Sequence, residues 1–371
     1  MIHTTKDKNL KSLNTFGLKV KAARYLEYDR AADLARIEWD SLPKPVLSVG
    51  EGSNLLFTGD FPGTVLHSRI KGIEEIEERS SRDDVFVRVG AGVKWDDFCD
   101  WAARKELWGP ENLSAIPGTV GAAPVQNIGA YGVEAADIID SVECYDIEAG
   151  TFVTMTAEEC AFGYRDSFFK HNRGRYIVVY VDFHLYGDFR PRLEYAHLRE
   201  EVERNVEIYK ADADPYKLIY ETRYTPPMPL SPFLVRNTIK IIREGKLPDP
   251  SKVGSAGSFF KNPVVNREEY EKVRGIAAGS GTPQQAGDAA DVPHYDLPDG
   301  TVKIPAAWLI EFCGLKGLEL GKAAVWDRQP LVIVNAHGNA TPQDILNLET
   351  HIIEKVNDTF GIVLTPEVDH I

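Results

Sequence analysis

The chain has 371 residues, of which 43% are hydrophobic and 26% charged, a composition typical of globular proteins. Its formal net charge of −14 argues against binding to nucleic acid or anionic membranes, because both need a basic protein surface. No signal segment is visible, and no apolar run approaches the ~20 residues that a membrane-spanning helix needs. We therefore expect a cytoplasmic protein with neither nucleic-acid nor membrane partners.

The four cysteines also exclude some classes of protein. Cys99, Cys144, Cys160 and Cys313 are scattered and form no CxxC pair. Without such spacing, a structural zinc site and a disulfide framework are both disfavoured. We expect reduced thiols and no bound metal.

The first half of the chain alternates predicted helices and strands. Asp29 is expected to cap a short helix over 31–39, and 46–49 has the apolar character of a buried strand. The period-two pattern of 85–89 predicts another strand. Apolar residues then recur at helical spacing over 95–102, which predicts a helix.

The second half begins with strand-like runs at 140–147 and 176–185. The charged, tyrosine-rich segment 187–243 suggests an inserted subdomain, and KLPDP at 246–250 marks a boundary. Beyond it we expect a compact α/β unit.

This last unit has clear signals of its own. A helix is predicted over 304–312 and a strand over 331–334. Thr341, followed by proline, is expected to cap a long helix that ends at Gly361.

Two glycine-rich loops are the first candidates for a binding site. They lie at 50–54 and 113–132, and the second contains too many glycines and prolines to be one regular element. Glycine lets backbone amides approach an anion such as a diphosphate closely. Taken alone, the first loop is more often a plain turn, but the two together favour a cofactor.

Three further segments carry candidate side chains. Arg165, in FGYRDS, could bind a carboxylate through a forked pair, although a surface ion pair is the commoner role for such an arginine. Ser258, in GSFFKNP, could instead satisfy a local amide in a turn. Glu367, near the C-terminus, would usually be a solvated carboxylate. None of these residues decides the function alone.

In order along the chain, these segments resemble UDP-N-acetylenolpyruvoylglucosamine reductases, flavoenzymes that make UDP-N-acetylmuramate. The resemblance covers nearly the whole chain, and the blocks IPGTVG…QNIGAYG and GSFFKNP are highly specific. The matching pieces are NTFGL (14–18), VGEGSNLL (49–56), VRVGAGVKW (87–95), ENLSAIPGTVGAAPVQNIGAYG (111–132), FGYRDSFF (162–169), KLPDP (246–250), GSFFKNPVV (257–265), AAWLIEFCGLKG (306–317) and LTPEV (364–368).

The resemblance implies an α+β fold in three parts. An FAD-binding fold of the vanillyl-alcohol-oxidase type, made of two α/β subdomains, is expected over 1–72 and 73–243. The second subdomain would contain the inserted substrate loop of the family's longer form. A C-terminal α/β substrate-binding domain is expected over 244–371.

The resemblance also implies which residues bind ligands. The flavin would be held by backbone contacts from Gly50, Glu51, Gly52, Ser53, Asn54, Pro117, Gly118, Gly121, Asn127, Gly129 and Gly132. The substrate, UDP-N-acetylglucosamine enolpyruvate, would be bound by Tyr164, Tyr195, Lys246, Lys261 and Asn262. Tyr195 and Lys246 match residues that bind the UDP part, and the surroundings of Tyr195 follow the family pattern only loosely.

Three catalytic roles transfer by position. Ser258 matches the proton donor, and Arg165 and Glu367 match the pair at the substrate carboxylate. NADPH would first reduce FAD, and the reduced flavin would then give hydride to the enolpyruvyl group. We expect the enzyme to act as a monomer.

Two departures from the family pattern stand out. Relatives commonly continue PEV with arginine, whereas Asp369 and His370 follow here, so an ion pair could be missing or rerouted. Phe312 occupies a position that is often polar. Neither departure affects the three catalytic residues.

Two other functions remain open from the sequence. Another FAD-dependent oxidoreductase of the same fold would keep the glycine loops but lack GSFFKNP and PEV. A non-catalytic flavin- or nucleotide-sugar-binding protein would have no need of Ser258, Arg165 and Glu367.

Overall fold

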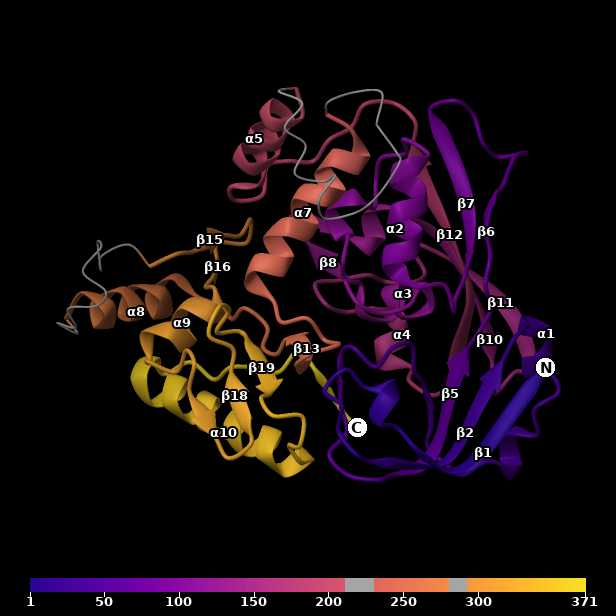
Figure 1. Cartoon of the computed structure of the whole chain (residues 1–371), viewed down its shortest axis with the longest axis horizontal. Coiled ribbons are helices and arrows are strands. Elements are labelled where there is room, and N and C mark those ends of the chain that lie inside the picture. Colours follow the sequence, from indigo (N-terminus) through magenta and orange to yellow (C-terminus); the bar gives the residue numbers. More distant parts are fainter. Residues whose placement is uncertain (211–229, 280–291) are drawn as a thin grey trace. The chain divides into compact units, whose positions relative to one another are not determined.

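The computed structural model describes residues 1–210, 230–279 and 292–371. The chain forms two compact units, and Figure 1 follows it by colour through both. Unit 1 comprises Met1–Lys8, Ala22–Glu51 and Phe61–Glu244, and unit 2 comprises Asn9–Lys21, Gly52–Asp60 and Gly245–Ile371. The division into 1–72, 73–243 and 244–371 stays a prediction.

Unit 1 contains a four-stranded sheet with the strand order β1-β2-β5-β3. The central strand β5 pairs in parallel with both β2 and β3. The strand expected over 46–49 is confirmed by β3. The strands are β1 (Ile2–Asn9), β2 (Lys21–Tyr28), β3 (Val46–Ser48) and β5 (Phe61–Ser68).

A five-stranded antiparallel sheet, in the order β11-β10-β12-β7-β6, forms the other layer of unit 1. The strands expected over 85–89, 140–147 and 176–185 are confirmed by β7, β10 and β12. The five strands are β6 (Ile73–Glu75), β7 (Asp84–Gly90), β10 (Ile139–Asp146), β11 (Thr151–Thr156) and β12 (Tyr176–Tyr186).

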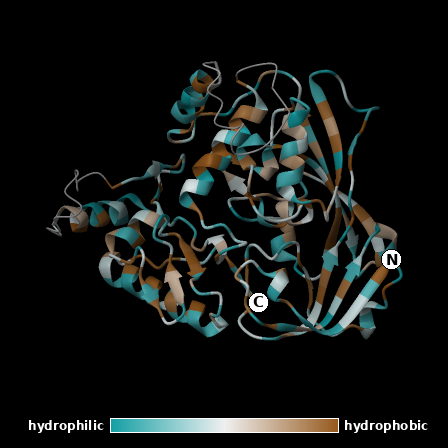
Figure 2. Ribbon diagram, viewed as in Figure 1, coloured by the Kyte–Doolittle hydropathy of each residue, from teal (hydrophilic) through white to brown (hydrophobic). Residues whose placement is uncertain are grey.

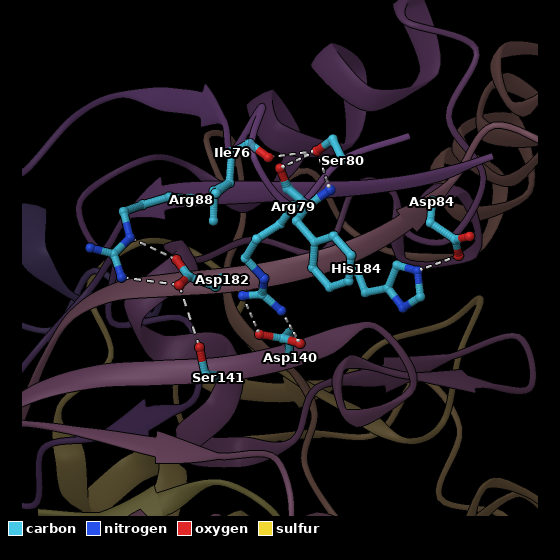
Figure 3. A network of polar contacts seen from close by, with 10 residues as sticks. Ile76, Arg79, Ser80, Asp84, Arg88, Asp140, Ser141, Asp182 and His184 are labelled. Atoms are coloured by element: carbon cyan, nitrogen blue, oxygen red, sulfur yellow. Dashed lines mark hydrogen bonds and ion pairs between the residues drawn. The ribbon is translucent and has the colours of Figure 1, made fainter. Parts of the chain in front are cut away.

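The two faces of this second sheet have different chemistry. Val181, Phe183 and Leu185 of β12 are buried in a core that also contains Phe98 of helix α2 (Trp95–Arg104), which confirms the helix expected over 95–102. The alternate residues of the strand carry polar contacts (Figure 3). There Arg88 pairs with Asp182 at 2.8 Å, Arg79 with Asp140 at 2.9 Å and His184 with Asp84 at 2.7 Å.

The helix expected over 31–39 is wrong in its extent and its cap. Helix α1 spans only Ala31–Leu34, Arg30 is its N-cap, and a separate 3₁₀ turn, η2, covers Trp39–Ser41. Asp29 lies 3.3 Å from the N-terminal amine and 3.6 Å from Arg69. Two cations therefore attract the carboxylate that the sequence pattern assigned to a helix cap.

In the described part of the segment between β12 and unit 2 lie the helices α5 (Leu198–Lys210) and α7 (Pro232–Lys246). Leu198 and Val202 of α5 share an apolar cluster with Val235 and Ile239 of α7 and with Trp108. The short elements of unit 1 are η3 (Glu111–Leu113), η4 (Val120–Ala122), α3 (Ala123–Gln126), β8 (Gly129–Ala130), β9 (Val133–Glu134), η5 (Ala135–Asp137) and α4 (Phe168–His171).

Unit 2 is built around a four-stranded sheet in the order β13-β19-β18-β17. A three-stranded sheet has the order β14-β16-β15, and β4 pairs with β20. The strands are β4 (Leu55–Leu56), β13 (Gly254–Ser258), β14 (Val264–Val265), β15 (Tyr295–Asp296), β16 (Val302–Lys303), β17 (Glu319–Leu320), β18 (Ala323–Val325), β19 (Val332–Asn335) and β20 (Asp369–His370).

The helices of unit 2 follow the sequence pattern closely. The helices expected over 304–312 and after Thr341 are confirmed by α9 (Ala306–Phe312) and α10 (Pro342–Phe360), and the strand expected over 331–334 by β19. The Asp344 amide donates to the hydroxyl of Thr341. Gly361 ends α10 with φ of 71°, a left-handed conformation that glycine adopts at little cost.

One face of α10 forms part of the core of unit 2 (Figure 2). Ile345, Leu348, Ile352 and Val356 are fully buried there, at the three- and four-residue spacing of a helix face. The remaining helical elements of this unit are α8 (Arg267–Gly279) and the 3₁₀ turn η1 (Lys11–Leu13).

Candidate active site

The two glycine-rich loops meet in unit 1. The Gly118 amide donates to Oε2 of Glu51 at 2.9 Å. A Cβ added at Gly50 would lie 2.5 Å from Oγ1 of Thr119, so no larger residue fits between the loops. The prediction that both loops belong to one site is supported by this contact.

The first loop crosses from unit 1 to unit 2 between Glu51 and Gly52. Within unit 2, Gly52 has φ of 64°, and a Cβ at this position would lie 2.1 Å from the carbonyl oxygen of Leu13. Both its conformation and its close approach to another backbone segment therefore require glycine.

Hydrogen bonds to a neighbouring segment hold the second loop. The Trp95 amide donates to the Gly118 carbonyl, and the Gly121 amide donates to the Ala91 carbonyl, each at 2.9 Å. Ala115 and Tyr131 have φ of 58° and 50°, a conformation that costs residues other than glycine about 1–3 kcal/mol each. The loop is irregular, as predicted, and the surrounding structure fixes its shape.

Asn127 supports the loop from inside. It is fully buried, its amide donates to Glu134 and to the Gly163 carbonyl at 2.8 and 2.9 Å, and its Oδ1 accepts from the Ala136 amide at 3.0 Å. Since these contacts occupy its side chain, Asn127 could contact a ligand only through its backbone, as the resemblance implies.

Gln126, which precedes it, presents a donor without a partner. Nζ of Lys170 donates to Oε1 of Gln126 at 3.0 Å. A lysine ammonium can only donate, so this contact fixes the orientation of the amide. Nε2 is then left buried with no hydrogen-bond partner among the described residues. A bound ligand with an acceptor oxygen or nitrogen would satisfy it.

Arg165 lies against the second loop and is not an exposed surface ion pair. Its side chain is 16% exposed, and Nη2 donates to the Gly129 carbonyl at 2.6 Å. The residue has φ of 54° at the tip of a turn that is closed by hydrogen bonds between Gly163 and Asp166. Strained backbone of this kind is concentrated at functional sites.

A buried ion pair fastens the second loop to the inserted helix α7. Arg236, on α7, donates to both carboxylate oxygens of Asp96 at 2.6 and 3.0 Å. The same carboxylate accepts the amide of the strained residue Ala115 at 2.6 Å. Burial opposes ionisation, but Arg236 and this amide hold the pKa of Asp96 below its ordinary value.

Arg236→Met is expected to lower the free energy of unfolding by about 3 kcal/mol, because it leaves a hydrogen-bonded carboxylate without its buried partner. Urea denaturation measures this change. The matched control is Arg204→Met, which removes an exposed pair with Glu201 on helix α5 and should cost less than about 0.5 kcal/mol. Equal losses in the two variants would contradict the role of Arg236.

In unit 2, Ser258 ends strand β13 just after an irregularity. The pairing of β13 with β19 shifts register between Ser255 and Ser258, and Gly257 within this bulge has φ of 69°. Such bulges redirect the side chain that follows them. Ser258 therefore does not continue the regular pairing register of the strand.

The segment that carries Glu367 runs beside the residues that follow Ser258. The Glu367 amide donates to the Phe259 carbonyl at 2.8 Å. The Asn54 side chain donates to the Glu367 carbonyl at 3.2 Å, and the Asp369 amide donates to the Asn54 carbonyl at 3.0 Å. Unit 2 thus brings Ser258, Glu367 and the end of the first glycine loop onto adjacent backbone segments.

The predicted substrate residues are divided between the two units, and each has contacts within its own unit. In unit 1, Tyr164 lies beside Arg165, and the ring of Tyr195 contacts that of Tyr131 at 6.0 Å between centroids. A Cβ added at Gly132 would lie 3.3 Å from Cβ of Tyr195. In unit 2, the Lys261 amide donates to the Thr365 carbonyl.

Asn262 and Lys246 also have structural contacts in unit 2. Oδ1 of Asn262 accepts the first amide of α9 at 2.9 Å, and the Lys246 carbonyl accepts the indole N–H of Trp326 at 3.1 Å. The ligand-binding roles of all these residues, including Ser53 and Pro117, stay predictions.

Over residues 1–210, 230–279 and 292–371, no group of histidine, cysteine or acidic side chains could hold a metal ion, and no helix is long and apolar enough to cross a membrane. All four cysteines are free thiols.

The sequence pattern did not single out Gln126 or Lys170. Gln126 lies within a motif that carries the resemblance and Lys170 directly follows another, but only the folded structure shows that Lys170 fixes the amide of Gln126. After PEV, where the sequence leaves a missing or rerouted ion pair open, Nε2 of His370 lies 2.7 Å from Glu349.

Comparisons with known proteins identify the domains and the family of this chain. A family model described as "FAD binding domain" matches residues 34–156, and one described as "UDP-N-acetylenolpyruvoylglucosamine reductase, C-terminal domain" matches 249–371. UDP-N-acetylenolpyruvoylglucosamine reductases of Bacteroides fragilis and Porphyromonas gingivalis are 43% and 39% identical to this chain, each alignment covering 98% of both chains.

A solved structure shows the same fold. The crystal structure of UDP-N-acetylenolpyruvylglucosamine reductase from Thermus caldophilus aligns with a TM-score of 0.60 and 24% identity, covering 100% of this chain and 98% of that one. The predicted fold class is confirmed.

The matched FAD-binding domain and the reductases that align with the chain define an FAD-dependent oxidoreductase. Identity of about 40% over nearly the whole length settles the family, and the resemblance seen in the sequence is confirmed. The chain belongs to the UDP-N-acetylenolpyruvoylglucosamine reductases.

Proposed function

We propose that this protein uses NADPH and bound FAD to reduce UDP-N-acetylglucosamine enolpyruvate to UDP-N-acetylmuramate in peptidoglycan precursor synthesis. The observation that carries this proposal is the pairing, within unit 2, of the segment after Ser258 with the segment of Glu367. Those two segments, GSFFKNP and PEV, separate this family from other flavoenzymes of the same fold. A cytoplasmic monomer without nucleic-acid or membrane partners is part of the proposal.

The residues of the two loops fit a flavin. Their glycines let the loops pack closely against neighbouring protein segments, and Nε2 of Gln126 is a buried donor that has no acceptor among the described residues. The heterocycle and diphosphate of FAD are rich in acceptors. Residues from Gly50 to Asn54 and from Pro117 to Gly132 would hold it. Bound FAD would supply hydride transfer between NADPH and the terminal carbon of the enolpyruvyl group.

Arg165 has the chemistry to bind the carboxylate of the enolpyruvyl group. Hydride addition puts negative charge on the carbon next to this carboxylate, and the charge spreads into it. A guanidinium that is 16% exposed and already oriented by the Gly129 carbonyl would stabilise that charge strongly, because a preorganised cation in a dry site needs little reorganisation.

Glu367 and Ser258 would complete the reaction. Glu367, sharing a proton with the substrate carboxylate, would hold it in place. Ser258 would give its hydroxyl proton to the carbon that bears the negative charge. A weakly acidic serine suits this step because the carbanion is strongly basic.

The proposal is tested by mixing the purified protein, NADPH and UDP-N-acetylglucosamine enolpyruvate. We expect a yellow protein that consumes NADPH only when this substrate is present and that forms UDP-N-acetylmuramate. A colourless protein that takes up no FAD, or NADPH oxidation that is indifferent to this substrate, would contradict it. The second outcome would favour another FAD-dependent oxidoreductase.

A further inference from the structure

The C-terminal segment, residues 365–371, has a side-chain anchor beyond the backbone contacts of Glu367. Nε2 of His370 lies 2.7 Å from Oε2 of Glu349 on helix α10. The Glu349 side chain is 10% exposed and that of His370 is 31% exposed. The imidazole of His370 therefore contacts the buried carboxylate of Glu349.

The same imidazole touches the residue that follows Ser258. Its ring meets the Phe259 ring nearly edge to face, with 6.2 Å between centroids and 87° between planes. Phe259 is fully buried, and its carbonyl accepts the Glu367 amide at 2.8 Å. His370 is thus linked to the backbone beside two proposed catalytic residues, Ser258 and Glu367.

The surroundings of His370 favour its charged form. The hydrogen bond with Glu349 raises the pKa of His370 above its ordinary value, and Asp369 and the Val368 carbonyl add to this effect. The neighbours supplied by other elements, Phe259 and the β4 residue Leu56, carry no charge. Among the described residues, the charges of Glu349 and Asp369 raise the pKa of this imidazole, and burial opposes them.

We propose that His370 is a positioning residue whose protonated ring, bound to Glu349, holds the segment carrying Glu367 in its working position. This inference rests on the role proposed for Glu367. Neutral imidazole can still donate one hydrogen bond to Glu349, so loss of the proton weakens the anchor without removing it.

The direction of the pH effect follows from the raised pKa. The stabilisation due to the charged pair is fully present below the pKa of histidine in the unfolded chain. It is lost as the pH rises through the higher pKa of the folded protein. Glu367 should therefore be held best below neutral pH and least well in alkaline solution.

The experiment measures the half-reaction that needs Glu367. FAD-loaded enzyme is reduced by NADPH without oxygen and is then mixed rapidly with UDP-N-acetylglucosamine enolpyruvate at each pH. His370→Gln keeps a neutral donor towards Glu349 and cannot be protonated. We expect the reduced flavin of the wild-type enzyme to be reoxidised about fivefold faster than that of this variant near pH 6. The two reoxidation rates should converge at about pH 9.

Two further variants make the test decisive. Glu349→Gln removes the charge of the carboxylate that pairs with His370 and should abolish the same pH-dependent difference in reoxidation rate. This second variant keeps the test valid if His370→Gln fails to fold. His184→Gln changes a similar histidine–carboxylate pair on the five-stranded sheet (Figure 3) and should keep the wild-type profile. Reduction by NADPH should be unchanged in all three.

The inference is overturned if wild type and His370→Gln share one pH profile, or if His370→Gln slows both half-reactions equally at every pH. That second outcome would indicate a purely structural contact. Failure of the proposed function looks different, because wild type would then not be reoxidised by this substrate at any pH.

Discussion

Ser258→Ala is expected to slow reoxidation of the reduced enzyme by UDP-N-acetylglucosamine enolpyruvate by about 10³-fold. Reduction by NADPH should stay near the wild-type rate. The reason is that a positioned proton donor contributes roughly 10²–10⁴-fold to the step in which it acts, and only the second step needs this proton. Rapid mixing, with the flavin absorbance as the signal, measures the two half-reactions separately.

The matched control is Ser255→Ala, on the same strand. Ser255 is buried and lies before the bulge, so its hydroxyl is not in the position assigned to the proton donor. We expect this variant to carry out both half-reactions. Equal slowing of both half-reactions in Ser258→Ala would count against the proton-donor role and in favour of a general disturbance.

Arg165→Lys is expected to lower the rate of the same second half-reaction by about 10²–10³-fold, the usual effect of losing a preorganised stabilising donor. Lysine keeps the charge but lacks the planar fork that binds a carboxylate through two bonds. It would also lose the contact by which the Gly129 carbonyl orients the guanidinium. Stopped-flow kinetics at saturating substrate separates this loss from weaker binding.

Arg175→Lys serves as the control for this change. Arg175 pairs with Asp146 at 2.8 Å and lies outside every motif that carries the resemblance, so its variant should keep both half-reactions. A wild-type second half-reaction in Arg165→Lys would show that the forked geometry of Arg165 is not required.

Local elements were predictable because their signals are short-range. Strand β7 follows from alternating valines, and α10 follows from a threonine cap, an apolar face and a terminal glycine. The cap expected at Asp29 was wrong because the N-terminal amine and Arg69 attract that carboxylate. Neither partner belongs to the local pattern.

The contacts of the candidate site were less accessible to sequence reasoning. The glycine loops could be recognised, but their contact through Glu51 and Gly118 depends on long-range packing. In the same way, only folding shows that the segments of Phe259 and Glu367 are hydrogen-bonded neighbours. The family resemblance supplied the residues, and the structure supplied the contacts among them.

Charged and polar side chains were the hardest to assign. Asn127 stays a predicted cofactor residue through its backbone, and the structure adds that its side chain holds the loop. The sequence pattern does not single out Gln126. Its Oε1 accepts a hydrogen bond from Lys170, which leaves the Nε2 donor buried without a partner among the described residues. Such assignments depend on the direction of single hydrogen bonds, which residue spacing does not encode.

A crystal structure of the oxidised enzyme with FAD and UDP-N-acetylglucosamine enolpyruvate would test the central claim most directly, since without NADPH this complex cannot react. We expect Arg165 and Glu367 at hydrogen-bond distance, about 3 Å, from the enolpyruvyl carboxylate, with the Ser258 hydroxyl facing the adjacent carbon. If the enolpyruvyl group instead lay away from the flavin, or were contacted by none of these three side chains, the proposed mechanism would be contradicted.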